Sequence, residues 1–120
     1  MKHILIIEDE EQVQGLLRTM LENAGYAVSV AGDGVAGLAA FRQNRADLVV
    51  TDIMMPEKDG VETIREIRKT SSQVKIIAIT GYRGPFNRLP AAEYVGAQKT
   101  LVKPFRKAQL LEAVEDLLKN

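Results

Sequence analysis

The sequence contains no cysteine, which excludes a disulfide framework, a thiolate metal site and a cysteine nucleophile. It also has no excess of either charge, because 16 basic residues balance 16 acidic ones. This balance argues against a domain built mainly to hold nucleic acid. No apolar run reaches the length of a membrane-spanning helix, and the run in "MKHILII" is too short for a signal peptide. We therefore expect a cytoplasmic chain that makes no contact with a membrane.

Short apolar runs alternate with helical patterns along the chain. At 120 residues, of which 46% are hydrophobic, this predicts one domain over 1–120 with a substantial core. Strands are predicted at 3–7, 26–30, 47–51, 74–80 and 100–102. Helices are predicted at 13–24, 33–43 and 61–69, near Pro90, and over a last segment that includes 110–118.

Alternation of this kind predicts a parallel sheet, because a helix between two strands carries the chain back through a right-handed crossover, so that the next strand runs in the same direction. The strands are almost continuously apolar, as expected for strands that are buried on both faces. The predicted fold class is therefore α/β, with a doubly wound five-stranded parallel sheet flanked by five helices. The common strand order for such a sheet is 2-1-3-4-5.

Carboxylates follow the first and third predicted strands, where that strand order reverses and such sheets bind ligands. Glu8 and Asp9 follow the first strand, and Asp52 follows the third. Acids in one cleft repel one another, so a cation with a preference for oxygen ligands is expected. Mg²⁺ fits this role, whereas zinc fits poorly because the single histidine, His3, lies within a strand.

A hydroxyl and an ammonium group follow the remaining strands. Thr80 ends the fourth strand and Lys103 follows the fifth. Facing metal-bound carboxylates, they would form a site for a phosphoryl group. Each residue alone has a simpler interpretation: Asp9 as a helix cap, Thr80 as a strand end, Lys103 as a surface charge. Their convergence at one edge of the sheet favours the functional interpretation.

Four segments in this order resemble the receiver domain of bacterial two-component response regulators, the CheY-like superfamily with a flavodoxin-like fold. The segments are "ILIIEDEE", "LVVTDIMMPEKDG", "IIAITG" and "GAQKTLVKPF". The resemblance covers essentially the whole chain. It implies a phospho-accepting signalling domain that is not an enzyme in the usual sense, although it catalyses its own phosphorylation and slow autodephosphorylation.

The resemblance also implies the chemistry of each matching residue. Asp52 matches the acceptor of a phosphoryl group from the phosphohistidine of a sensor kinase or a histidine phosphotransfer protein. Asp9 matches the direct Mg²⁺ ligand, Glu8 its acidic neighbour, and the backbone carbonyl of Met54 a further ligand beside Asp52. Phosphorylation would change the binding of a downstream effector protein or a fused output domain, without direct contact of this domain with nucleic acid.

Other matching residues are expected to support switching and hydrolysis. Thr80 matches the hydroxyl that moves toward the phosphoryl group, and Lys103 matches the lysine that pairs with acceptor and phosphoryl oxygens. The bond from Lys103 to Pro104 is expected to be cis. Met54 and Tyr82 flank the expected approach of water, so they are predicted to tune the lifetime of the acyl phosphate.

Three features depart from the family pattern. Glu8 stands where an aspartate is more common, and its longer side chain should still reach a metal-bound water. Thr100 stands where many members have an aromatic residue that turns inward on activation, and a threonine cannot perform that rotamer switch. Prolines interrupt the segment 81–99, so signalling through the last part of the domain is expected to differ.

Three other functions fit parts of the sequence. A haloacid-dehalogenase-type phosphatase would need an Asp-x-Asp pair after its first strand, where this chain has Glu8-x-Glu10. A flavin binder would need a hydroxyl- and glycine-rich loop there, and "EDEEQ" repels phosphate. A receiver that has lost its chemistry would not keep all the site residues. Dimerisation on phosphorylation, and whether the domain stands alone or belongs to a longer regulator, are left open by the sequence.

Overall fold

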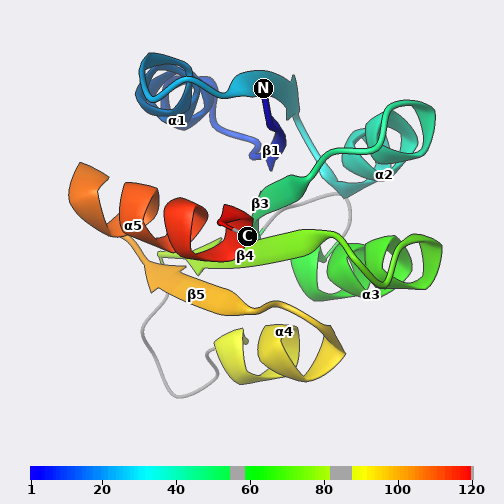
Figure 1. Cartoon of the computed structure of the whole chain (residues 1–120). Helices are drawn as coiled ribbons and strands as arrows, with labels where there is room; N and C mark the ends of the chain where they lie inside the picture. Colours follow the sequence, from blue (N-terminus) through cyan, green and yellow to red (C-terminus); the bar gives the residue numbers. More distant parts are fainter. Residues whose placement is uncertain (55–58, 82–87, 120) are drawn as a thin grey trace.

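The computed structural model describes residues 1–54, 59–81 and 88–119. Its five parallel strands have the order β2-β1-β3-β4-β5, as predicted. Figure 1 shows the twisted sheet with helices on both sides. The strands are β1 (His3–Ile7), β2 (Ala27–Ala31), β3 (Leu48–Asp52), β4 (Lys75–Thr80) and β5 (Lys99–Val102). The helices are α1 (Glu11–Asn23), α2 (Gly34–Gln43), α3 (Gly60–Thr70), α4 (Leu89–Val95) and α5 (Lys107–Leu118).

The predicted elements are all present, with small shifts at their ends. The third strand extends one residue further than expected, so Asp52 is the last residue of β3 and not the first residue after it. The short helix α4 begins at Leu89 and has Pro90 in its first turn, where proline's missing N–H costs nothing. No helix among the described residues is long and apolar enough to cross a membrane.

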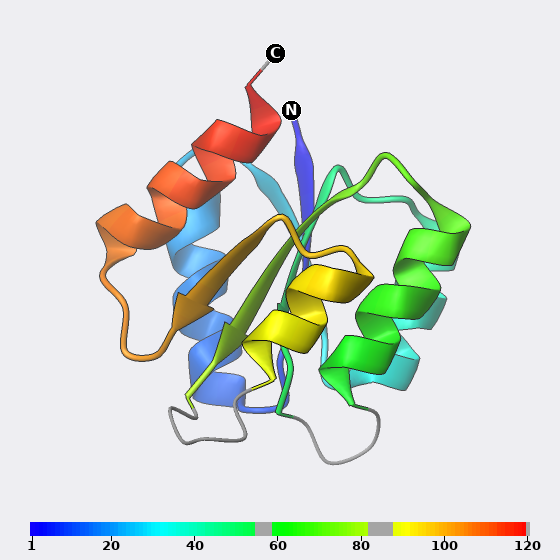
Figure 2. The same ribbon diagram turned by 90° about the horizontal axis from the view of Figure 1, so that it is seen from below.

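Two apolar cores lie on the two faces of the sheet. Helices α2, α3 and α4 cover one face, and α1 and α5 cover the other (Figure 2). Side chains of a strand alternate between the faces, so Ile76 packs into the first core and Ile77 into the second. Strand β3 lies at the centre and is buried at every position, which holds its last residue rigidly.

Two glycines are required by local geometry. Gly60 begins α3 directly against the end of β3: a Cβ there would lie 2.3 Å from the Ile53 Cα and 2.6 Å from the Asp52 carbonyl oxygen. Gly96 ends α4 with φ +130°, a conformation that other residues rarely adopt. Gly60 therefore allows α3 to start in contact with the strand that carries Asp52.

Candidate functional site

Lys103 joins the carboxyl ends of three strands. Its backbone N–H donates to the Thr80 carbonyl at 2.8 Å, which places the residue directly after β5 and beside β4. Its ammonium nitrogen lies 3.0 Å from Glu8 Oε1 and 2.8 Å from Asp52 Oδ2. The bond to Pro104 is cis, as predicted. One cation thus binds acids from β3 and from the turn after β1.

Asp52 is held at the carboxyl end of the central strand β3, and both of its carboxylate oxygens accept hydrogen bonds. Its side chain faces the site, yet the residue is only 4% exposed. The backbone N–H of Met54 donates to Oδ1 at 2.7 Å, and Lys103 binds Oδ2. Because β3 is central and buried, the carboxylate has a fixed position, as a nucleophile in a group-transfer reaction requires.

Glu8, which binds Lys103 together with Asp52, is fully buried. The pKa of Glu8 is raised to about 7: burial is the main cause and the negative charge of Asp52 adds to it, while the Glu10 amide and Lys103 act in the opposite direction. The Glu10 N–H donates to Glu8 Oε2 at 3.1 Å. For Lys103, burial alone would lower the pKa, but hydrogen bonds and charge interactions with Asp52 and Glu8 outweigh it and raise the pKa. The site therefore favours a positive lysine between two acids.

The turn after β1 offers oxygen ligands for a metal ion. Ligand oxygens of Glu8, Asp9 and Glu10 lie within 4.8 Å of one another, and the carboxylates of Asp9 and Glu10 are open to solvent. An all-oxygen donor set suits Mg²⁺. His3 lies at the other end of β1, where its Nε2 is 2.7 Å from Ser29 Oγ, so it adds no ligand here. The residues present thus fit a hard divalent cation.

The structure adds one acid to those near the predicted ligands, and the predicted ligand set itself stays a prediction. Glu10, which sequence reasoning did not select as a ligand, belongs to the cluster of close carboxylates, whereas Asp52 is not among its described members and is linked to Glu8 through Lys103. The signal was the acidic run "EDEE" itself, but only the folded turn shows which of its acids converge.

The other predicted residues lie at varying distances from this centre. Thr80 is 1% exposed at the end of β4, beside the site. Met54 is half-exposed and contacts Asp52 through its backbone N–H; the predicted metal contact of its carbonyl stays a prediction. Tyr82 lies outside the described residues.

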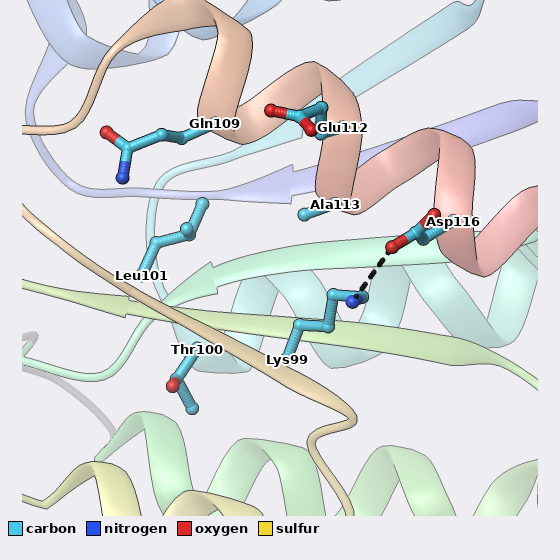
Figure 3. Close-up of a pocket in the computed structure, with 7 residues that line it drawn as sticks. All are labelled: Lys99, Thr100, Leu101, Gln109, Glu112, Ala113 and Asp116. Carbon is cyan, nitrogen blue, oxygen red and sulfur yellow. Dashed lines mark hydrogen bonds and ion pairs between the residues drawn. The ribbon is translucent and has the colours of Figure 1, made fainter.

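Thr100 is not at the centre of the site. It pairs with Ala78 in the sheet, two residues before the Thr80–Val102 pair at the carboxyl end. It lines an open pocket of about 360 Å³ between β5 and α5, where Lys99 forms an ion pair with Asp116 at 3.2 Å. Figure 3 shows Leu101 directed toward α5 and Thr100 directed away from it.

The match to a known family decides the identity. The family model of the response regulator receiver domain matches residues 4–115. The chain belongs to the response regulator receiver domain family. Receiver domains of this family are parts of two-component signalling systems, and the predicted resemblance is confirmed.

The receiver's curated relatives include transcriptional regulators and response regulators of bacteria. It is 35% identical over 118 residues to YkoG of Bacillus subtilis, called an uncharacterized transcriptional regulatory protein, covering 98% of this chain and 51% of YkoG. It is 37% identical over 117 residues to the response regulator MprA of a Mycobacterium species, covering 98% of this chain and 50% of MprA. The chain thus spans about half the length of these relatives.

Solved receiver structures share the fold. The chemotaxis protein CheY4 of Vibrio cholerae superposes with a TM-score of 0.90 at 30% identity, covering 98% of this chain and 99% of that one. The response regulator TrrA of Thermotoga maritima, solved in complex with Mg²⁺-BeF, gives a TM-score of 0.88 at 36% identity and covers 98% and 100% of the two chains. The doubly wound receiver fold is therefore confirmed.

Proposed function

We propose that this receiver accepts a phosphoryl group on Asp52 from a phosphohistidine of a sensor kinase or phosphotransfer protein. A carboxylate oxygen of Asp52 forms the new bond to phosphorus, the bond from phosphorus to the histidine nitrogen breaks, and the histidine leaves with that electron pair. The observation that supports this most is the fixed Asp52 carboxylate, with Lys103 at 2.8 Å and the Met54 N–H at 2.7 Å.

Mg²⁺ is the proposed cofactor, held by Glu8, Asp9, Asp52 and the Met54 carbonyl. When bound, it neutralises charge on the transferring group. TrrA, the relative solved with Mg²⁺-BeF, supports the choice of cation. The acidic cluster supports it too, because closely spaced carboxylate oxygens are ligands that Mg²⁺ prefers.

Lys103 and Thr80 have proposed roles after transfer. Lys103 already binds the acceptor, so a small movement of its flexible side chain can carry the ammonium to a phosphoryl oxygen. Thr80 ends the neighbouring strand and supplies a hydroxyl donor at the same edge. Thr100 lies further along β5, and we propose that switching runs through Thr80 with a small rearrangement at Thr100, in place of an aromatic rotamer change.

Incubation with Mg²⁺ and a small acyl phosphate tests the acceptor. The wild-type protein should gain one acid-stable, base-labile phosphoryl group per chain by mass spectrometry, and Asp52→Asn should gain none. Asp116→Asn is the matched control, because Asp116 is an exposed acid far from the site. Equal modification of wild type and Asp52→Asn would rule out Asp52, and continuous turnover of many phosphomonoesters would favour a phosphatase.

Met54 is proposed to set the lifetime of the acyl phosphate together with Tyr82. Met54 is half-exposed and its backbone N–H binds the Asp52 carboxylate, so we propose that its side chain screens the acyl phosphate from water. Met54→Asn replaces this screen with an amide that can orient a water molecule, so we expect faster loss of the phosphoryl group. An unchanged rate of dephosphorylation would remove Met54 from the proposal.

The output is proposed from the relatives. Their names include transcriptional regulation, and each is about twice the length of this chain. We propose that phosphorylation changes how the domain binds an effector protein, a fused output region or a second copy of itself, in the cytoplasm. A phosphorylation-dependent change in the sedimentation of the whole protein would show pairing of two copies.

A further inference from the structure

Helix α1 begins without the side-chain cap that usually fixes a helix start. Glu10 occupies the N-cap position, but its side chain makes no capping hydrogen bond. A cap residue normally accepts a bond from the first turn and sets how the chain enters the helix. The acidic turn that precedes α1 must therefore be fixed in another way.

Gln14 provides this connection from within α1. Its side-chain Nε2 donates to the backbone carbonyl of Glu8 at 2.5 Å, reaching back over six residues. Its own backbone N–H donates to the Glu10 carbonyl at 2.9 Å. These two bonds close the turn from both sides, so the half-buried Gln14 joins the first helical turn to the end of β1.

The Glu8 peptide is the point at which several contacts meet. The Glu8 N–H donates to the Ala31 carbonyl at 3.0 Å and its side chain binds Glu10 N–H and Lys103. In the part of the chain that the structure describes, Gln14 is the only residue that donates a hydrogen bond to the Glu8 carbonyl. Asp9 lies between the held residues Glu8 and Glu10, so the direction of its exposed carboxylate follows from that turn.

We propose that Gln14 is a positioning residue for the acidic turn: it sets the relative positions of the Glu8 and Asp9 carboxylates and thereby the affinity for a divalent cation. The inference rests on the proposed function, because the cation belongs to it. Gln14 acts through the Glu8 backbone and touches neither the cation nor Asp52. Groups that orient metal ligands in this indirect way strongly affect metal affinity.

A residue that only stabilised helix α1 would have a different effect. Its loss would lower the free energy of unfolding of the metal-free protein and leave the Mg²⁺ dissociation constant unchanged. A positioning residue changes the dissociation constant itself, because the carboxylates must be brought back to the bound spacing at the expense of binding energy. The two roles are therefore separable by measuring both quantities.

The test compares Gln14→Met, Gln14→Asn and Gln12→Met with the wild type. Methionine keeps the length of the side chain without an N–H donor, and asparagine keeps the amide but shortens the arm by one methylene. Gln12 is exposed in the same turn of α1 and serves as the control. Mg²⁺ titrations followed by calorimetry give the dissociation constants, and urea unfolding in a chelator gives the stability of each metal-free variant.

We expect both Gln14 variants to raise the Mg²⁺ dissociation constant roughly tenfold, the lower end for groups that orient ligands, and Gln12→Met to leave it unchanged. The amide ¹⁵N shift of Asp9 should move in the Gln14 variants, since its peptide unit contains the Glu8 carbonyl. Wild-type affinity in Gln14→Met, with or without lost stability, overturns this inference alone. Absence of Mg²⁺ binding by the wild type overturns it together with the proposed metal site.

Discussion

Lys103 and Arg68 are two partly buried cations at opposite ends of the sheet, and their side chains bind different kinds of oxygen. Lys103 binds two carboxylates. Arg68, on α3, forms no ion pair in the part of the chain that the structure describes. It donates instead to neutral oxygens: Ser71 O at 3.3 Å, Ser72 O at 3.0 Å, Val74 O at 2.6 Å, Gly96 O at 2.8 Å and Gln98 Oε1 at 3.2 Å.

The pKa values of the two groups move in opposite directions. Burial lowers the pKa of Arg68, because its acceptors have no net charge. Burial also opposes the charge of Lys103, but Asp52 and Glu8 raise its pKa above the ordinary value. Arg68 is a fixed connection that closes the turns at the ends of α3 and α4, which run side by side (Figure 2). Lys103 lies between two acids that repel each other, so we expect its ammonium group to move when a further negative charge is added to the site.

Replacing each of these two cations with methionine should distinguish their roles most clearly. Lys103→Met removes the charge that faces the transferring group, so phosphoryl acceptance should slow by about 100-fold, as when one electrostatic donor is lost. Arg68→Met is the matched control and should leave the rate nearly unchanged. Initial rates with an acyl phosphate and Mg²⁺ measure both. Similar rates for the two variants would contradict the difference in role.

The free energy of unfolding should fall more for Arg68→Met than for Lys103→Met. Arg68→Met leaves carbonyls of three loop residues and of Gly96 without their donor, so the free energy of unfolding should fall by about 2–4 kcal/mol. Urea unfolding measures the loss. Arg68→Lys should recover only part of it, because an ammonium cannot span both turns as the planar fork does. A loss below about 0.5 kcal/mol, typical of a surface substitution, would mean that the network adds little.

Glu8, the buried acid that binds Lys103, should make the free energy of unfolding depend on pH. The pKa of Glu8 is about 7 in the folded chain against 4.5 ordinarily, so the folded state holds the proton more tightly than the unfolded state. This contribution is fully present below pH 4.5 and is lost as the pH rises toward 7. We expect metal-free wild type to lose about 1–3 kcal/mol across this range.

Glu8→Gln isolates that contribution. Glutamine cannot ionise, so urea unfolding of this variant should vary less with pH than that of the wild type. Asp116→Asn, which changes an exposed acid on α5, should keep the wild-type dependence. A wild-type and a Glu8→Gln curve of the same slope would show that Glu8 does not titrate in this window.

The smallest effect is expected for a second arginine between α3 and α4. Arg88, before α4, lies 2.9 Å from Asp59 at the start of α3, and the two side chains are 46% and 41% exposed. Arg88→Ala should cost less than about 1 kcal/mol, because exposed ion pairs contribute little. Added salt should reduce even this difference. Unfolding with and without salt provides the measurement, and a loss as large as that of Arg68→Met would contradict it.

The fold could be predicted because its signals are local. Apolar runs of strand length, helical spacing and the position of Pro90 each depend on neighbouring residues, and the strand order follows from general rules of crossover. Asp52 and Lys103 could be placed at one edge for the same reason. The exact end of β3 was missed by one residue, since Asp52 continues the ladder with its backbone whatever its side chain does.

The contacts made by residues outside the predicted site could not be predicted from the sequence. Arg68 binds carbonyl oxygens of turns, and a backbone carbonyl has no signature in the sequence. Gln14 resembles any polar residue at the start of a helix until its side chain is seen to reach Glu8. Thr100 was linked to switching by resemblance, but which face of β5 it occupies depends on the register with β4.

The bond between Lys103 and Glu8 joins residues that are 95 positions apart in the chain. During synthesis Glu8 and Asp52 emerge long before Lys103, so a chain that ends at β4 contains both acids without the cation that binds them. Contacts of such long separation form late in folding, after the entropy of closing the intervening loops has been overcome. We therefore expect the proposed phosphoryl acceptance at Asp52 to reach its full rate only once β5 has joined the sheet, so that this rate would report completed folding.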